Sequence, residues 1–246
     1  MPASVDARLR RGASHTQNFT LSNTTGTRLR FRCSVEDVWY DERNTRVTGR
    51  PGTLPRSASE WVQFSQPEVV IEPYSSVVVK AIVTVPQTAA GGYYTSPVFE
   101  AMPADPLKSA PASQDDIATT TIRVRFRGLM MFTTLDATEY NVEIMGGHVS
   151  PPTASSELEM QLDVRNRSTT HARVRGAFAI LNSSGSLVGR GTIEEKRYLP
   201  GQRSNLRAGW SGGLPAGKYT SVITLSYDRV GIEPTTLSYE LPLVVQ

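Results

Sequence analysis

The strongest constraint in this sequence is a strict alternation of apolar and polar residues over long stretches. In the segment 29–35 every odd-numbered residue is apolar, Cys33 among them, and in the segment 158–164 every even-numbered residue is apolar. A period of two places successive side chains on opposite faces of a β-strand, whereas an amphipathic helix needs apolar residues three to four positions apart. The chain is therefore predicted to be all-β, with Cys33 on a buried face. Further strands are expected at 69–72, 76–85, 93–102, 117–127, 173–181, 219–227 and 237–245.

An internal repeat divides the chain into two halves. The matching motifs are 21–25 with 164–169, 71–75 with 198–202, and 90–93 with 215–219. Two copies of one domain type explain these matches most economically. The 246 residues leave room for two domains of roughly 110 to 130 residues, each with its own core. Short strands bounded by Gly, Pro, Asn and Ser are typical of sandwiches. We expect two tandem immunoglobulin-like β-sandwich domains, at 1–135 and 136–246.

Several classes of function are disfavoured by composition. A net charge of +3 gives no bulk attraction for nucleic acid, and a single cysteine excludes an intrachain disulfide and a cysteine-based metal site. The three histidines are scattered, which predicts no metal site. The segment Gly209–Gly213 matches the G-x-S-x-G pattern of hydrolases, but no histidine follows it to serve as the base. We expect a chain that is not an enzyme and needs no cofactor.

Arginines alternate along two of the expected strands of the first half. They are Arg28, Arg30 and Arg32 on one strand and Arg123, Arg125 and Arg127 on the other. In a standard sandwich both strands flank the strand 93–102, so all these guanidinium groups would share one face. Opposed like charges destabilise a sheet, so this face favours an anionic partner. The alternative is an ordinary solvated face, neutralised by Glu36, Glu100 and water.

Short motifs of the chain resemble the periplasmic pilus-assembly chaperones, which have two immunoglobulin-like domains. The motifs are Ala7-Arg8-Leu9, the Asn23 motif, Ile71-Glu-Pro73, and the stretch from Phe99 to Phe132 that contains Ile122-Arg-Val-Arg-Phe-Arg127. The resemblance implies that the strand 117–127 lies at the edge of the first domain and binds a subunit by β-augmentation. It also implies that basic residues hold the terminal carboxylate of that subunit.

The resemblance and the arginine pattern together predict a partner-binding site. Its expected members are Arg8, Ile117, Ile122, Arg123, Arg125 and Arg127, with Arg28, Arg30 and Arg32 on the neighbouring strand. Arg8 together with Arg125 or Arg127 is expected to anchor the carboxylate. The expected partner is another envelope or surface protein, such as a pilus-like subunit, and neither nucleic acid nor a membrane span is expected.

The location of the protein is an expectation of the same resemblance. The segment 1–12 contains arginines but no apolar signal-peptide core, so the chain is either cytoplasmic or an exported chain from which the signal peptide has been removed. The resemblance implies the second, with a periplasmic or cell-surface location.

The alternative to a chaperone is a structural or adhesive surface module that acts as a spacer or binds a glycan. The residues 118–121 are small and polar, unlike the bulky alternation of a strand that is lent to a partner. The motifs Gly91-Gly-Tyr93 and Trp61–Phe64 also resemble immunoglobulin-type modules of bacterial surface proteins. A glycan-binding module would need an exposed aromatic platform that contains Trp39, Tyr40 or Trp61.

Overall fold

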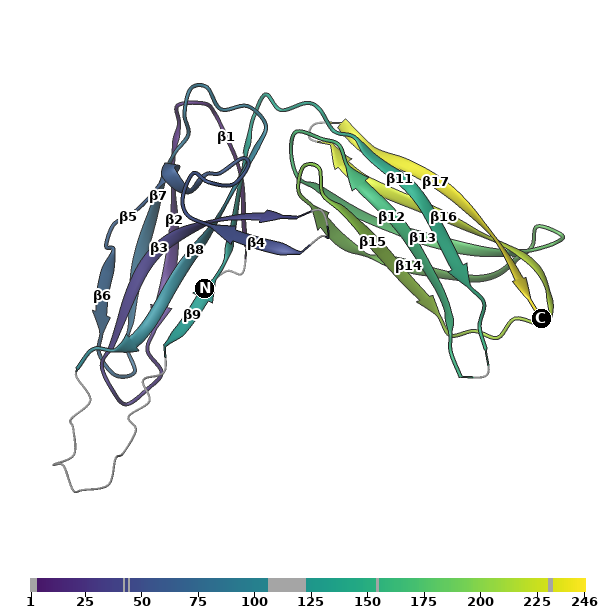
Figure 1. The fold of residues 1–246 in the computed structure, drawn as a ribbon, viewed down its shortest axis with the longest axis horizontal. Coiled ribbons are helices and arrows are strands. Elements are labelled where there is room, and N and C mark those ends of the chain that lie inside the picture. The colour runs from purple at the N-terminus through teal and green to yellow at the C-terminus, as the bar shows by residue number, and fades with distance from the viewer. Residues whose placement is uncertain (1–3, 42, 44, 106–122, 154, 230–231) are drawn as a thin grey trace, which may run out of the picture. The chain divides into compact units, whose positions relative to one another are not determined.

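The computed structural model describes residues 4–41, 43, 45–105, 123–153, 155–229 and 232–246. The protein is all-β, as predicted (Figure 1). The first ten strands are β1 (Ser4–Leu9), β2 (Ser14–Ser22), β3 (Leu29–Tyr40), β4 (Arg46–Gly49), β5 (Val62–Phe64), β6 (Glu68–Ile71), β7 (Ser76–Thr84), β8 (Gly92–Pro103), β9 (Val124–Arg127) and β10 (Leu129–Thr134). They are followed by β11 (Val142–Ser150), β12 (Leu158–Asn166), β13 (Ala172–Asn182), β14 (Leu187–Tyr198), β15 (Arg203–Trp210), β16 (Gly217–Arg229) and β17 (Ile232–Val245). A short 3₁₀ turn, η1, spans Ser59–Trp61.

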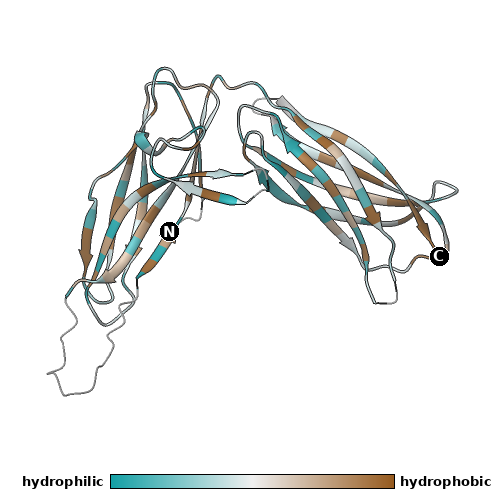
Figure 2. Cartoon of the chain, in the orientation of Figure 1, coloured by the Kyte–Doolittle hydropathy of each residue, from teal (hydrophilic) through white to brown (hydrophobic). Residues whose placement is uncertain are grey.

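The chain forms two compact units. The first unit comprises Met1–Trp39 and Val47–Asp136, and the second comprises Tyr40–Arg46 and Ala137–Gln246. Each unit consists of two sheets that enclose a separate apolar cluster. Hydropathy alternates along the strands of both units (Figure 2), which is the pattern of sheets with one buried face. Among the described residues, no helix is long and apolar enough to cross a bilayer.

In the first unit, one sheet has the strand order β1-β10-β8-β3-β4, with β6 paired to β3 and β9 paired to β8. The second sheet has the order β2-β7-β5. The side chains of Phe19 and Phe99 meet between the two sheets, with ring centroids 5.2 Å apart. Cys33 lies in this core at 6% exposure, as predicted, and burial raises the pKa of its thiol to about 11.

In the second unit, the sheet β11-β12-β15 faces the sheet β14-β13-β16-β17. The predicted inward residues of β12 are all buried: Leu158, Met160, Leu162 and Val164 are no more than 2% exposed. The alternation in the sequence therefore placed the core face of this strand correctly.

The sequence repeat has a structural counterpart in two buried asparagines. Asn23 donates from Nδ2 to the carbonyl oxygens of Thr27, Ile71 and Glu72, and its Oδ1 accepts from the backbone N–H of Thr25. Asn166 occupies the corresponding place in the second unit. It donates to the carbonyl oxygens of Thr170 and Tyr198 and accepts from the N–H of Ser168. In each unit, the asparagine lies at the end of one strand, and its side-chain amide binds a backbone carbonyl at the end of a second strand.

A buried carboxylate organises the long connection that follows β4. Asp37 on β3 is fully buried, and it accepts hydrogen bonds from the N–H groups of Thr53 and Leu54 and from the hydroxyl of Ser57. Burial by itself raises the pKa of Asp37. The hydrogen bonds to its charged form outweigh that effect, so the pKa is lowered overall.

Candidate partner-binding edge

The strand β9 lies at an open edge of the larger sheet of the first unit. β8 pairs with β10 through Gly92–Thr95 and, farther along on the same side, with β9 through Val98–Ala101. β1 covers the outer edge of β10 in parallel pairing that starts at Ser4 opposite Leu129. Among the described residues, β9 pairs with β8 alone (Figure 1). The outer edge of β9 therefore offers backbone N–H and C=O groups to a further strand.

One face of β9 is apolar and exposed. Val124 lies opposite Ala101 and Phe126 opposite Phe99, and directly opposed residues point to the same face of a sheet. Phe99 and Ala101 are buried in the core, but Val124 is 45% exposed and Phe126 is 49% exposed. The apolar face of the larger sheet therefore continues from buried residues on β8 to exposed residues on β9.

The other face of β9 carries the predicted arginines, and carboxylates compensate them. Arg125 Nη2 lies 2.7 Å from Oε1 of Glu36 on β3. Arg127 Nε lies 3.2 Å from the other carboxylate oxygen, Oε2, of the same residue. Arg123, just before β9, lies 3.7 Å from Glu100 on β8. Glu36 therefore joins β9 to β3 across the intervening strand β8. Exposed ion pairs contribute about 0.2–1 kcal/mol each, so these pairs position β9 more than they stabilise the fold.

Arg28, just before β3, and Arg30 on β3 are also compensated. Arg28 Nε lies 2.9 Å from Glu72, and Arg30 Nε lies 3.5 Å from Glu68. Arg32 is opposite Glu100 in register and forms no ion pair within 4 Å with a described carboxylate. The register confirms that β3 and β9 both flank β8. The face is nevertheless close to neutral, which is the alternative that the sequence left open.

The remaining predicted members of the site are separated or lie outside the described residues. Arg8 on β1 is half-buried and opposite Thr133 on β10. Thr133 is six residues beyond Arg127, which corresponds to roughly 20 Å along a strand. The structure therefore does not bring Arg8 together with Arg125 or Arg127. Ile117 and Ile122 lie outside the described residues.

Val124 and Phe126 were not among the predicted members of the site. The signal was present in the alternation of Ile122-Arg-Val-Arg-Phe-Arg127. Only the charged positions of Val124–Arg127 were predicted to bind a partner, because apolar residues of a long alternating strand are normally expected in the core. The exposure of Val124 and Phe126 becomes visible only from the pairing of β9 with β8 and the burial of each residue in the structure.

Two of the three aromatic residues considered for glycan binding, Trp39 and Trp61, take part in packing within the first unit. The ring of Trp39 lies 5.7 Å from that of Tyr94, and the ring of Trp61 lies 4.3 Å from that of Tyr93. Trp39 and Trp61 are each half-buried. These contacts orient both indoles toward neighbouring rings of the fold.

Comparison with known proteins finds similar structures. No family model matches the sequence, and none of the curated proteins matches it. The class 5 fimbriae chaperone CfaA matches with a TM-score of 0.51 at 13% identity, over 98% of this chain and 98% of that chain. A chain from the chaperone–tip adhesin complex of CFA/I fimbriae biogenesis matches with a TM-score of 0.51 at 12% identity, over 97% and 95% of the two chains. The protein therefore has the fold of the fimbrial chaperones, in agreement with the resemblance found in its sequence.

Proposed function

We propose that this chain is a non-enzymatic chaperone-like protein of the periplasm or cell surface that binds a protein subunit along the outer edge of β9. The observation that carries the proposal is the combination of a β9 edge that pairs with no described strand and the exposed side chains of Val124 and Phe126. An edge strand that also presents an alternating apolar row matches the requirements of β-augmentation.

In the proposed complex, a strand of the subunit pairs with the backbone of β9. Val124 and Phe126 enter the apolar interior of the subunit and complete its core. Full burial of such a side chain is worth about 1.5–3 kcal/mol, and these two are already half-covered, so each would add roughly 1 kcal/mol. Glu36 holds Arg125 and Arg127, so the strand is positioned before the subunit arrives, which lowers the entropic cost of binding.

The arginines have separate roles in this proposal. Arg125 and Arg127 are engaged by Glu36, and they act as positioning residues for β9. Arg8, roughly 20 Å away along the adjoining strands, is the proposed anchor for a carboxylate of the subunit, as expected from the sequence resemblance. Ile122 precedes Val124 in the sequence at the same spacing of two, and we include Ile122 and Ile117 in the proposed binding segment. Arg28, Arg30, Arg32 and Arg123 border it on the same sheet.

The fold comparison supports the choice of partner. The matched fimbrial structures include a complex between a chaperone and a tip adhesin, which is a property of those proteins. By analogy of fold, we propose an envelope or surface subunit as the partner of this chain.

The test is affinity purification of the tagged full chain from the cell envelope of its own organism, followed by mass spectrometry. The double variant Val124→Asp/Phe126→Asp should lose the recovered subunit, because charges on the apolar row cannot enter a core. The matched control is Val78→Asp/Ile82→Asp on β7, since these residues are similarly exposed, at 49% and 39%, on the other sheet of the first unit.

The recovered complex should also protect the amides of β9 from hydrogen exchange. A subunit recovered equally by the wild type and by both double variants would refute binding through β9. Recovery of no envelope protein by the wild type would instead favour a spacer module.

A further inference from the structure

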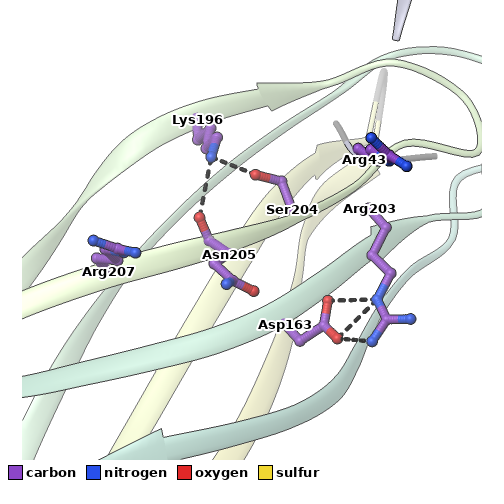
Figure 3. A pocket seen from close by; sticks show the side chains of 7 residues that line it. All are labelled: Arg43, Asp163, Lys196, Arg203, Ser204, Asn205 and Arg207. Carbon is purple, nitrogen blue, oxygen red and sulfur yellow. Dashed lines mark hydrogen bonds and ion pairs between the residues drawn. The ribbon is translucent and has the colours of Figure 1, made fainter. Parts of the chain in front are cut away.

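The second unit contains an open hollow with an excess of positive charge. The hollow has a volume of about 620 Å³ and lies over β12, β14 and β15 (Figure 3). It is lined by Arg43, Asp163, Lys196, Arg203, Ser204, Asn205 and Arg207, and we call it the basic hollow. The hollow contains no residue of β9, so a ligand can bind there whether or not β9 binds a subunit.

Lys196 is the central cation of the basic hollow. Its half-buried ammonium donates to Ser204 Oγ at 2.5 Å and to the backbone oxygen of Asn205 at 3.0 Å (Figure 3). An ammonium has three donors, so one N–H remains. No carboxylate of the described residues lies within 4 Å of it. Burial, and then the nearby charge of Arg207, lower the pKa of Lys196.

The other cations of the basic hollow differ in how they are paired. Arg203 is held by both oxygens of Asp163, with Nε at 2.9 and 2.8 Å (Figure 3). Arg207 has only a distant contact with Glu159, at 3.8 Å, and its side chain is 67% exposed. Arg203 is therefore already engaged, whereas Lys196 and Arg207 repel one another and both retain donors.

We propose that Lys196 and Arg207 bind a carboxylate from an acidic side chain of a protein partner. Two cationic donors on adjacent strands suit the two oxygens of a carboxylate. A doubly charged phosphate fits less well, because Asp163 lines the hollow and Glu159 lies 3.8 Å from Arg207, and both would repel the second negative charge. In this proposal, the second unit binds an acidic segment of the partner through a polar site that is separate from β9.

The test uses the isotopically labelled full chain and follows its backbone amides by NMR. The probes are the capped peptides acetyl-Gly-Glu-Glu-Gly-amide and acetyl-Gly-Gln-Gln-Gly-amide, and inorganic phosphate. The Glu peptide should produce saturable shifts at Ser204–Arg207, and the Gln peptide should not. Arg207→Gln and Lys196→Met should each weaken binding of the Glu peptide about tenfold, the usual effect of losing a charge-assisted hydrogen bond.

Two controls separate binding from folding. Lys218→Met removes an exposed lysine from β16 and should leave the affinity unchanged. Lys196→Arg keeps the positive charge and should retain most of the binding even if Lys196→Met unfolds. Equal shifts with the Glu and Gln peptides, unchanged affinity in Arg207→Gln, or tighter binding of phosphate than of the Glu peptide would each overturn the proposal.

Discussion

At the scale of single residues, a few buried polar side chains satisfy backbone hydrogen-bonding groups, which apolar side chains cannot do. Asn166 is fully buried, and its amide satisfies two carbonyl groups and one N–H of the surrounding backbone. Buried backbone groups without partners are costly, so such an asparagine is tied to its position.

We expect Asn166→Ala to reduce the free energy of unfolding of the second unit by about 2–4 kcal/mol, because it leaves several buried groups unsatisfied. Urea denaturation measures this change. The control is Asn182→Ala, since Asn182 Oδ1 accepts similar backbone bonds in an exposed turn and its loss should cost less than about 1 kcal/mol. Equal losses in the two variants would contradict this role of burial.

Asp37 gives a prediction for pH dependence. Its pKa is lower in the folded chain than in the unfolded chain, so its stabilisation is present above its unfolded pKa of about 3.9 and is lost as the pH falls through its folded pKa. We expect the stability difference between the wild type and Asp37→Asn to be largest near neutral pH and to shrink below about pH 4. Denaturation at a series of pH values measures it, and a difference that is independent of pH would contradict the prediction.

At the scale of elements, the position of β9 depends on one carboxylate. Glu36→Gln removes the ion pairs of both Arg125 and Arg127. We expect faster hydrogen exchange in Val124–Arg127, and a global loss of stability below about 1 kcal/mol because the pairs are exposed.

The control for this change is Glu68→Gln, which removes the contact with Arg30 and leaves β9 intact. Exchange in β9 that is the same in both variants would show that Glu36 does not position the strand.

The elements that the sequence predicted well are those with clean alternation. β3 and β12 have such a pattern and were placed with their buried faces correct. β14 was not predicted, since its burial pattern is irregular and its pairing with β13 shifts register twice. For the candidate site, the arginines and their common flanking strand could be predicted. The carboxylates that neutralise them and the exposure of Phe126 depend on which strands are neighbours, which a local pattern does not specify.

At the scale of the whole molecule, each apolar cluster lies within one unit. We expect Leu162→Ala, at a position with 1% exposure, to destabilise the second unit by about 2–5 kcal/mol. The first unit should be unaffected. Hydrogen exchange resolved along the sequence distinguishes the units, and equal deprotection of β3 and β12 would contradict separate cores.

The single buried cysteine has a consequence for where the chain can fold. The thiolate is the form that attacks disulfides and reacts with oxidants, and the raised pKa of Cys33 leaves very little of it at neutral pH. With no second cysteine in the sequence, neither unit depends on a covalent cross-link. The chain should therefore reach the same native state in a reducing cytosol and in an oxidising compartment, without thiol oxidases or isomerases.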